Sequence, residues 1–157
     1  SIADEYHYQS KRIDEITRTL SDIAHHHPLC RILLSIPGIG PINATAIYCA
    51  IGNGSQFKNG REFAVWLGLT PKQSSSGDKM SSAGITKRGN RYLRKQLVHG
   101  ARAVLSRSKN KSDRLSRWTQ QLVARRGVAK ASVALAARIA RLSWVLLQKQ
   151  ELYQPKD

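Results

Sequence analysis

A run of serines is the first part of the sequence whose residue types are suited to chemistry. Ser74, Ser75 and Ser76 precede a glycine within residues 72–89, a polar segment rich in serine and glycine that predicts a long loop. A serine hydroxyl can attack phosphorus when neighbouring cations stabilise the developing negative charge. Taken alone, a serine-rich loop is more typical of a linker, and no Gly-x-Ser-x-Gly elbow of a hydrolase accompanies it.

Basic residues near the serines are candidates for holding phosphate. They are Lys79 in the same segment and, further along the chain, Lys87, Arg88, Arg91, Arg94 and Lys95. Guanidinium groups bind phosphate oxygens through paired hydrogen bonds. The three arginines are therefore suited to stabilising negative charge during an attack on phosphorus.

A second motif, residues 36–41, lies between two short apolar stretches and contains Gly38 and Gly40. The order Ile-Pro-Gly-Ile-Gly-Pro is typical of a helix-hairpin-helix, an element that binds DNA without reading its bases. The glycines permit a tight turn beside a phosphate backbone, and the second helix offers its unpaired amide N–H groups to a phosphate. An ordinary connection between two helices explains the same residues equally well.

Neither a metal site nor a cofactor is expected in this chain. Metal-dependent strand cleavage needs several converging carboxylates, whereas the acidic residues here are scattered, with adjacent pairs only at residues 4–5 and 14–15. The three histidines at residues 25–27 are consecutive, so their side chains point in different directions and are a poor ligand set for one ion.

The distribution of charge indicates a polyanionic partner. The 157 residues include 26 Lys and Arg against 10 Asp and Glu, a net charge of +16. Residues 1–57 are nearly neutral, whereas residues 58–157 hold 22 of the basic residues and five acidic ones. A surface charged only for solubility would mix both signs, so the excess favours contact with nucleic acid.

Composition excludes several other classes of protein. A hydrophobic content of 41% is too high for a disordered basic tail, and two cysteines cannot form a disulfide framework, which indicates a cytoplasmic protein. Residues 129–147 are apolar, but Lys130, Arg138 and Arg141 interrupt them, which argues against a membrane span. The chain opens with Ser1 rather than Met, from which we expect a piece of a longer protein.

Helical periodicity dominates the chain and no convincing alternating strand pattern occurs, so the predicted fold class is all-α. Residues 5–24 predict a helix with a narrow apolar seam typical of a coiled coil, formed by Ile13, Ile16, Leu20 and Ile23. Further helices are predicted over residues 31–36, 42–51, 59–69, from Asn90 onward, from Ser112 to about Gly127, and over 129–149.

These elements divide the chain into an arm over residues 1–28, a main domain over residues 29–150 and a tail over residues 151–157. Within the main domain we expect a helix-hairpin-helix-like element at residues 31–52, the serine loop at 72–89 and a basic helical region at 90–150.

In combination and order, the motifs resemble the C-terminal domain of one transposase family. The family is the insertion-sequence family numbered one hundred and ten, especially its eleven-eleven group, together with the related Piv DNA invertases. The resemblance spans roughly residues 29–150, and its matching segments are residues 36–41, 63–71, 75–77, 85–94 and 99–103. Each motif alone is common, whereas their combination is specific.

The resemblance implies a function that requires more than this chain. Members look like a RuvC-like domain holding a divalent metal, here expected to be Mg²⁺, on an Asp-Glu-Asp-Asp site, followed by a coiled-coil connector and a serine-bearing domain. The serine would attack DNA and form a phosphoserine link; by position it is Ser76, with Ser75 the close alternative and Ser74 the distant one. Residues 85–94 would be the basic segment beside it, and residues 5–24 the connector. Members form oligomers, and some are guided by a bridge RNA.

We therefore expect the DNA-binding, serine-nucleophile half of a transposase or site-specific recombinase that mobilises an insertion sequence. It would act in the bacterial cytoplasm, associated with the nucleoid when bound to DNA, form homo-oligomers through its coiled coil and have no membrane partner. Without the metal domain we expect it to be inactive. The alternative is a non-catalytic helix-hairpin-helix module that binds DNA or structured RNA, which explains the charge and the glycines but asks nothing of the serines.

Overall fold

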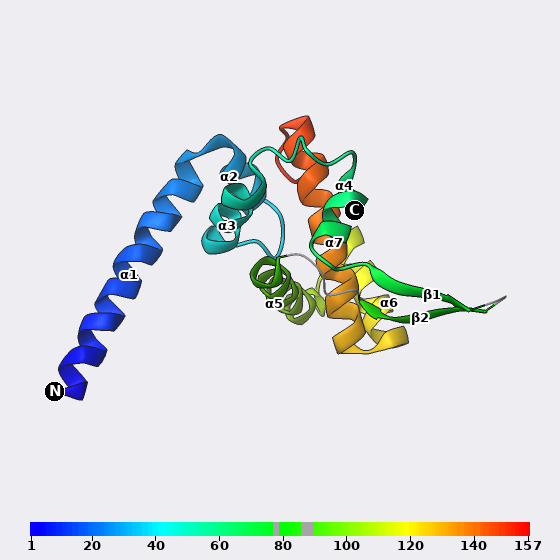
Figure 1. The fold of residues 1–157 in the computed structure, drawn as a ribbon, viewed down its shortest axis with the longest axis horizontal. Helices are drawn as coiled ribbons and strands as arrows, with labels where there is room; N and C mark the ends of the chain where they lie inside the picture. The colour runs from blue at the N-terminus through cyan, green and yellow to red at the C-terminus, as the bar shows by residue number, and fades with distance from the viewer. Residues whose placement is uncertain (77–78, 86–89) are drawn as a thin grey trace.

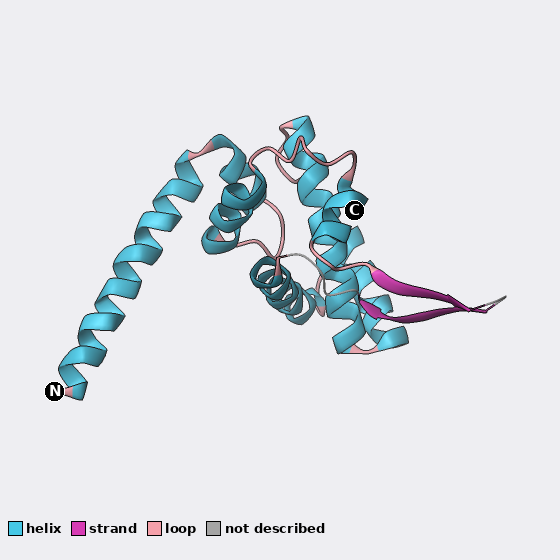
Figure 2. Ribbon diagram, in the orientation of Figure 1, coloured by secondary structure: helices cyan, strands magenta, loops and turns pink. Residues whose placement is uncertain are grey.

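The computed structural model describes residues 1–76, 79–85 and 90–157, over which the chain forms seven α-helices and one β-hairpin. Figure 1 shows a helical body from which two arms project, the N-terminal helix α1 and the hairpin β1–β2. Helices account for most of the described chain (Figure 2), so the all-α fold class predicted from the periodicity is confirmed for the body.

Helix α1 (Ile2–His26) forms the longer arm. Its first turn is held by a capping box in which the Ser1 hydroxyl and the Asp4 side chain each bond the other residue's backbone. Ala24 is its one buried residue, whereas Ile13, Ile16 and Ile23 of the predicted seam are exposed. The helix contacts α2 and α3 near its C-terminal end and extends away from the body over the rest of its length (Figure 1).

Helices α2 (Pro28–Leu34) and α3 (Pro41–Ile51) are joined by a short turn, as the sequence predicts. His27 ends α1 in an extended conformation and also caps α2, because its ring nitrogen accepts a hydrogen bond from the Leu29 N–H at 3.2 Å. Pro41 occupies the first turn of α3, where its missing N–H costs nothing. Helix α4 (Gly60–Trp66) follows and is capped by Asn59.

The last three helices form the centre of the body. Helices α5 (Arg91–Ser108) and α6 (Arg114–Arg126) both pack on α7 (Val128–Lys149), which also contacts α2 and α4. Asn90 caps α5 as predicted, whereas α6 is capped by Asp113 rather than Ser112. The prediction was one residue early because either side chain can cap a helix; the Asp113 carboxylate accepts from both the N–H and the hydroxyl of Ser116.

Helix α7 is long and apolar enough, by length and hydropathy alone, to cross a membrane. Half of its most apolar window is buried inside the body, where Leu135, Ile139 and Leu147 belong to the hydrophobic core. Its hydropathy is therefore accounted for by helix packing.

The segment predicted as a serine loop over residues 72–89 instead contains an antiparallel hairpin of β1 (Pro71–Ser76) and β2 (Lys79–Ile85). Its register pairs Pro71 with Ile85 at one end and Ser76 with Lys79 at the other, with an irregularity between Pro71 and Gln73. Among the described residues, neither strand packs against a helix. A strand without a core to face carries no alternation of apolar and polar residues, which is why periodicity missed it.

The residues after α7 fold back over the body. The backbone N–H of Tyr153 donates to the Ser35 hydroxyl at 2.8 Å, and the Arg114 N–H donates to the Lys156 carbonyl at 2.8 Å. The predicted tail therefore connects the turn before α3 with the start of α6.

Candidate nucleic-acid interface

The turn between α2 and α3 is built into the core rather than presented whole to solvent. Ile36 and Ile39 are buried, and Gly38 has φ +90°, a left-handed conformation that favours glycine. A Cβ on Gly38 would lie 3.1 Å from the carbonyl oxygen of Gly100, and a Cβ on Gly100 would overlap the Gly38 carbonyl. Gly38 and Gly100 therefore let the turn approach the backbone of α5, and Gly38 has a packing role that the sequence did not reveal.

Gly40 lies in a different environment from Gly38. It is exposed, has φ −94°, and a Cβ there would meet nothing within 4 Å. As the N-cap of α3 it supplies no side-chain cap, which leaves space for a ligand at the first turn of that helix. The side-chain amide of Asn43 donates to the Gln96 carbonyl at 3.4 Å and so holds this turn beside α5.

Helix α5 presents basic side chains on the face opposite its apolar residues. Leu93, Leu97 and Ala101 are buried in the core, while an exposed row runs along the other side. We call this row the α5 stripe, and it consists of Arg91, Lys95, His99 and Arg102. Its spacing of four, four and three residues keeps all of them on one helical face.

Two members of the α5 stripe were not among the sequence-based candidates. Arg102 lies seven residues after Lys95, and His99 lies between them. The helical spacing from Lys95 is the signal that identifies both. The candidates Arg91 and Lys95 are exposed in this stripe, one turn apart.

Arg94 differs from its neighbours on α5. It is half-buried, and its Nη1 donates to the carbonyl oxygen of Leu67, the residue that ends α4, at 3.2 Å. A cation near the last carbonyls of a helix also interacts favourably with the helix dipole. Arg94 therefore ties α5 to α4 and has a structural role besides any contact with phosphate.

The candidate serines lie on the projecting hairpin. Ser75 and Ser76 end β1, at the end of the hairpin opposite Pro71, and the register places Lys79 across from Ser76. A strand rises about 3.3 Å per residue, so Ser76 is roughly 16 Å further out than Pro71. The hairpin points away from the helices in Figures 1 and 2.

The sequence-based candidates are therefore divided between two places. Ser75, Ser76 and Lys79 share the outer end of the hairpin, whereas the α5 candidates and the glycine turn lie together on the body. Lys87 and Arg88 lie outside the described residues, so their relation to either group stays a prediction. Throughout the part of the chain that the structure describes, no three His, Cys, Asp or Glu side chains converge on a possible metal site.

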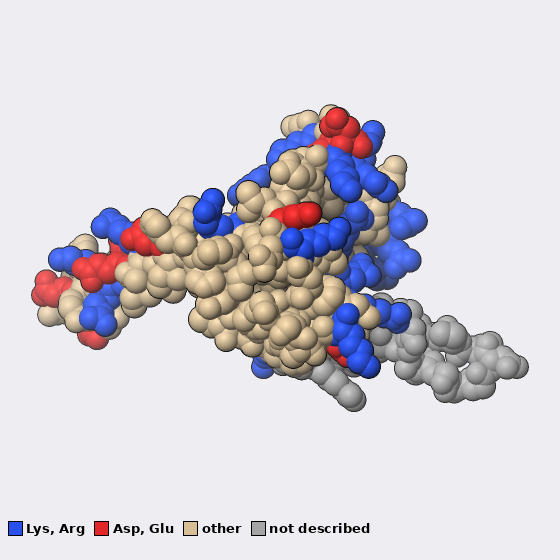
Figure 3. Space-filling view, turned by 90° about the horizontal axis from the view of Figure 1, so that it is seen from above, with Lys and Arg blue, Asp and Glu red and all other residues tan. Residues whose placement is uncertain are grey.

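The structure separates a region of mixed charge, α1, from a mainly basic body, as the division between residues 1–57 and 58–157 predicts. Figure 3 shows acidic and basic side chains mixed along α1, while basic side chains predominate on the body beside the hairpin. The ion pair that the structure shows among its described residues joins the Ser1 amino group to Asp4 at 3.2 Å, at the start of α1. The basic side chains of the body thus carry an excess of positive charge, which favours a polyanionic ligand.

Comparison with known proteins identifies the family of this chain. The model of the IS116/IS110/IS902 transposase family matches residues 30–117, which run from α2 into α6. The chain therefore belongs to this transposase family, as its motifs predict.

Individual relatives agree with the family match. The chain is 41% identical over 146 residues to the transposase for insertion sequence element IS1111A of Coxiella burnetii, covering 93% of this chain and 40% of that protein. It is 44% identical over 156 residues to a protein of Pseudomonas aeruginosa named probable family 20 transposase, covering 98% of this chain and 46% of the relative. A transposase for element IS1328 of Yersinia enterocolitica is 36% identical over 141 residues, covering 90% of the chain and 42% of the relative. The chain thus spans less than half the length of these relatives.

Proposed function

We propose that this chain is the DNA-binding, serine-bearing half of a transposase that mobilises an insertion sequence. The observation that carries the proposal is the family match over residues 30–117, which includes the glycine turn, the serines and the α5 stripe. The excess of positive charge on the body supports DNA as the partner. The acting protein would work in the bacterial cytoplasm, and a bridge RNA is a further partner that the family resemblance suggests.

In the proposed reaction Ser76 is the nucleophile, with Ser75 as the alternative. Its Oγ forms a bond to the phosphorus of a DNA phosphodiester as the bond from phosphorus to a deoxyribose oxygen breaks. The hydroxyl proton leaves Oγ, and a proton is taken up by the departing deoxyribose oxygen. One phosphoester bond forms as another breaks, so their number is unchanged. Attack by a deoxyribose hydroxyl of another strand on the phosphoserine reverses the step and joins the new strands.

The position of the serines supports the proposal that this chain alone is inactive. The serines end strand β1 of the projecting hairpin, whose strands pack on none of the described helices. The α5 stripe therefore does not surround them. The described residues also offer no set of ligands that fits a divalent ion. We propose that Mg²⁺ is held by a RuvC-like domain outside this chain and that the arm carries Ser76 to DNA held elsewhere in the assembly.

The arm α1 supports a proposal of homo-oligomerisation. Ile13 is 61% exposed and Ile16 is 53% exposed, although both belong to an apolar seam with coiled-coil spacing. Such a seam is stable when a second helix covers it. We propose that α1 of a second copy does so, and that oligomerisation brings serine arms and DNA-binding bodies together.

The glycine turn is proposed to act as a helix-hairpin-helix. The open space at exposed Gly40 allows a phosphate to approach the first turn of α3, while the packing of Gly38 on Gly100 holds that turn against α5. Phosphate contacts of this kind position a protein on DNA without reading the sequence.

The proposal is tested in two parts. The purified chain should bind duplex DNA, and the logarithm of its affinity should fall linearly with the logarithm of the salt concentration. It should not cleave DNA. Salt-insensitive binding would contradict the DNA-binding part, and cleavage by the nuclease-free chain would contradict the inactivity of this half.

The catalytic part requires the chain joined to its RuvC-like domain and supplied with element ends. A covalent protein–DNA adduct should form and should disappear in the double variant Ser75→Ala with Ser76→Ala. Ser82→Ala on the opposite strand of the same arm is the matched control and should retain the adduct. Normal recombination by the double variant would instead favour the non-catalytic helix-hairpin-helix module.

A further inference from the structure

A second basic surface lies across α4, α6 and α7, on residues that were not among the sequence-based candidates. Its starting point is the contact of α4 with α7: a Cβ on Gly60 would lie 2.7 Å from the carbonyl oxygen of Arg141. Lys58 and Arg61 stand on either side of Gly60 in the chain, and both are exposed. The close approach at Gly60 therefore places the start of α4, with these two exposed residues on either side, against the backbone of α7 at Arg141.

Helices α6 and α7 add two more guanidinium groups. The Cζ of Arg138 lies 4.5 Å from the ring centroid of Trp118, so the guanidinium of α7 stacks on the indole of α6. Arg114 precedes Trp118 by one turn of α6, and Arg141 follows Arg138 by nearly one turn of α7. The stacked pair thus holds Arg114 and Arg141 on one surface, which we call the α4–α7 flank: Lys58, Arg61, Arg114, Arg138 and Arg141.

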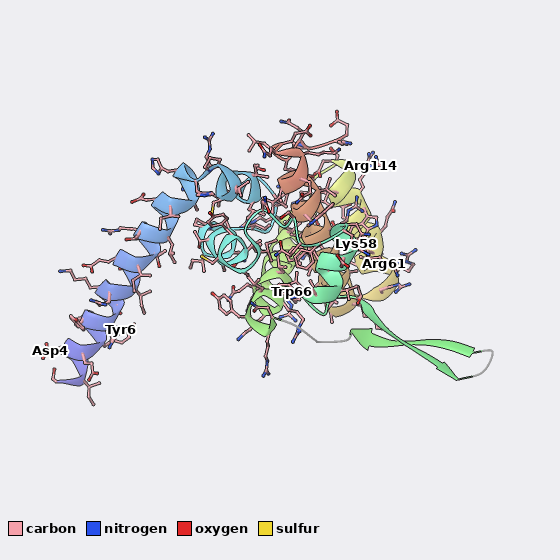
Figure 4. The ribbon with its side chains drawn as sticks, turned by 45° about the horizontal axis from the view of Figure 1, so that its top comes forward. Asp4, Tyr6, Lys58, Arg61, Trp66 and Arg114 are labelled. Atoms are coloured by element: carbon pink, nitrogen blue, oxygen red, sulfur yellow. The ribbon has the colours of Figure 1, made fainter. Side chains whose placement is uncertain are left out.

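Three of these cations, Arg114, Arg138 and Arg141, influence one another electrostatically. Burial lowers the pKa of the Arg138 guanidinium, and the charges of Arg114 and Arg141 lower it further. Figure 4 shows Lys58, Arg61 and Arg114 along the same flank of the body, while Trp66 of α4 lies apart from them.

Two carboxylates on these elements, Glu62 and Asp113, accept hydrogen bonds near the starts of α4 and α6. Glu62 accepts a hydrogen bond from the backbone N–H of Lys58 at 2.6 Å, and Asp113 caps α6 through Ser116. Among the described residues, the structure shows no ion pair between a cation of the flank and a carboxylate. A cluster of like charges without counter-charges repels itself unless an anionic ligand neutralises it.

We propose that the α4–α7 flank binds the phosphodiester backbone of a duplex DNA segment other than the one held by the α5 stripe. The inference rests on the proposed function, since it takes DNA as the partner of this chain. The α5 stripe lies on α5, whereas the cations of the flank come from α6, α7 and the start of α4, so the two groups of cations belong to different elements of the chain.

Duplex rather than single-stranded DNA fits the flank for a chemical reason. Proteins that bind single strands stack unpaired bases on exposed aromatic rings. On the flank the ring of Trp118 is already covered by Arg138. The surface therefore offers charge to a backbone and no aromatic platform to a base.

The experiment counts how many short DNA duplexes one chain binds, by sedimentation with labelled duplex in excess. The flank variant is Arg61→Gln with Arg114→Gln and Arg141→Gln, which leaves the half-buried Arg138 in place. The stripe variant is Arg91→Gln with Lys95→Gln and Arg102→Gln. The charge-matched control on α1 is Lys11→Gln with Arg12→Gln and Arg18→Gln, and the corresponding Arg→Lys triple variant of the flank separates charge from folding.

The wild-type chain, the α1 control and the lysine variant should each bind two duplexes, whereas the flank and stripe variants should each bind one. A wild-type chain that binds one duplex, with a flank variant of equal affinity, would overturn the flank proposal and leave the proposed function intact. A wild-type chain that binds no DNA would overturn both. A flank variant that loses only a structured RNA, and keeps both DNA duplexes, would overturn the assignment to DNA.

Discussion

The glycine turn (residues 36–41) and the hairpin β1–β2, here called the serine arm, are both rich in small residues, yet the two regions pack in opposite ways. In the turn, Ile36 is 2% exposed, Ile39 is 5% exposed, and Gly38 packs against the backbone of α5. In the arm, the described strands contact only each other. Small residues permit close packing in the first region, whereas in the second the described strands pack on no helix. Substitutions in the turn should therefore change stability, and substitutions in the arm should change chemistry.

The largest expected effect is on catalysis by the arm. In the chain joined to the proposed RuvC-like domain, Ser76→Ala should lower recombination by about a thousandfold or more, because it removes the proposed nucleophile and with it the covalent route. The melting temperature should not change, since the strand supports no part of the core. Recombination rates and thermal unfolding together test this; a clear drop in melting temperature would show that the arm is part of the folding unit.

The next largest effect is on stability through the turn. Gly100→Ala should lower the free energy of unfolding by about 3 kcal/mol, because the added methyl overlaps the Gly38 carbonyl and forces a backbone shift. Gly40→Ala is the matched control in the same turn and should cost less than about 1 kcal/mol, since its Cβ meets open space. Denaturant unfolding measures both, and equal losses would contradict the assigned contact.

A smaller effect concerns DNA affinity of the body. Arg91→Gln with Lys95→Gln should reduce the slope of log affinity against log salt by about 1.8, as two phosphate contacts are lost. Both residues are exposed, so stability should be unchanged. Arg94→Gln offers the contrast, because loss of its bond to Leu67 should lower the free energy of unfolding by about 1 kcal/mol. An unchanged salt slope in the double variant would remove the α5 stripe from the DNA interface.

The smallest effect on stability is expected for α1. Ile13→Ala with Ile16→Ala should change the free energy of unfolding of the monomer by less than about 0.5 kcal/mol, because both side chains are exposed. The same double variant should abolish self-association if the seam is covered by a second copy. Sedimentation at several protein concentrations compares the double variant with the wild-type chain, and undiminished association would place the interface elsewhere.

Much of the helical architecture was predictable because it is encoded locally. Leu93, Leu97 and Ala101 repeat with helical spacing and are buried as a group, and Asn90 and Gly127 bound their helices as expected. The hairpin was not predictable by the same means, because its strands bury no face and so show no alternation. For the candidate site, Arg91 and Lys95 lie on the exposed face of α5, while the chemical role of Ser76 stays a prediction.

By itself the sequence determined the family, the excess of positive charge and most helix boundaries, since these depend on residue types and on spacings within one turn of a helix. Only the tertiary structure decided which small residues serve packing: Gly38 meets Gly100, and Gly60 meets Arg141, across long separations in the chain. It also decided that Arg114 and Arg141 share one surface and that the serines stand apart from the α5 stripe. Contacts between distant segments leave no periodic pattern, because each partner is chosen by the shape of the other.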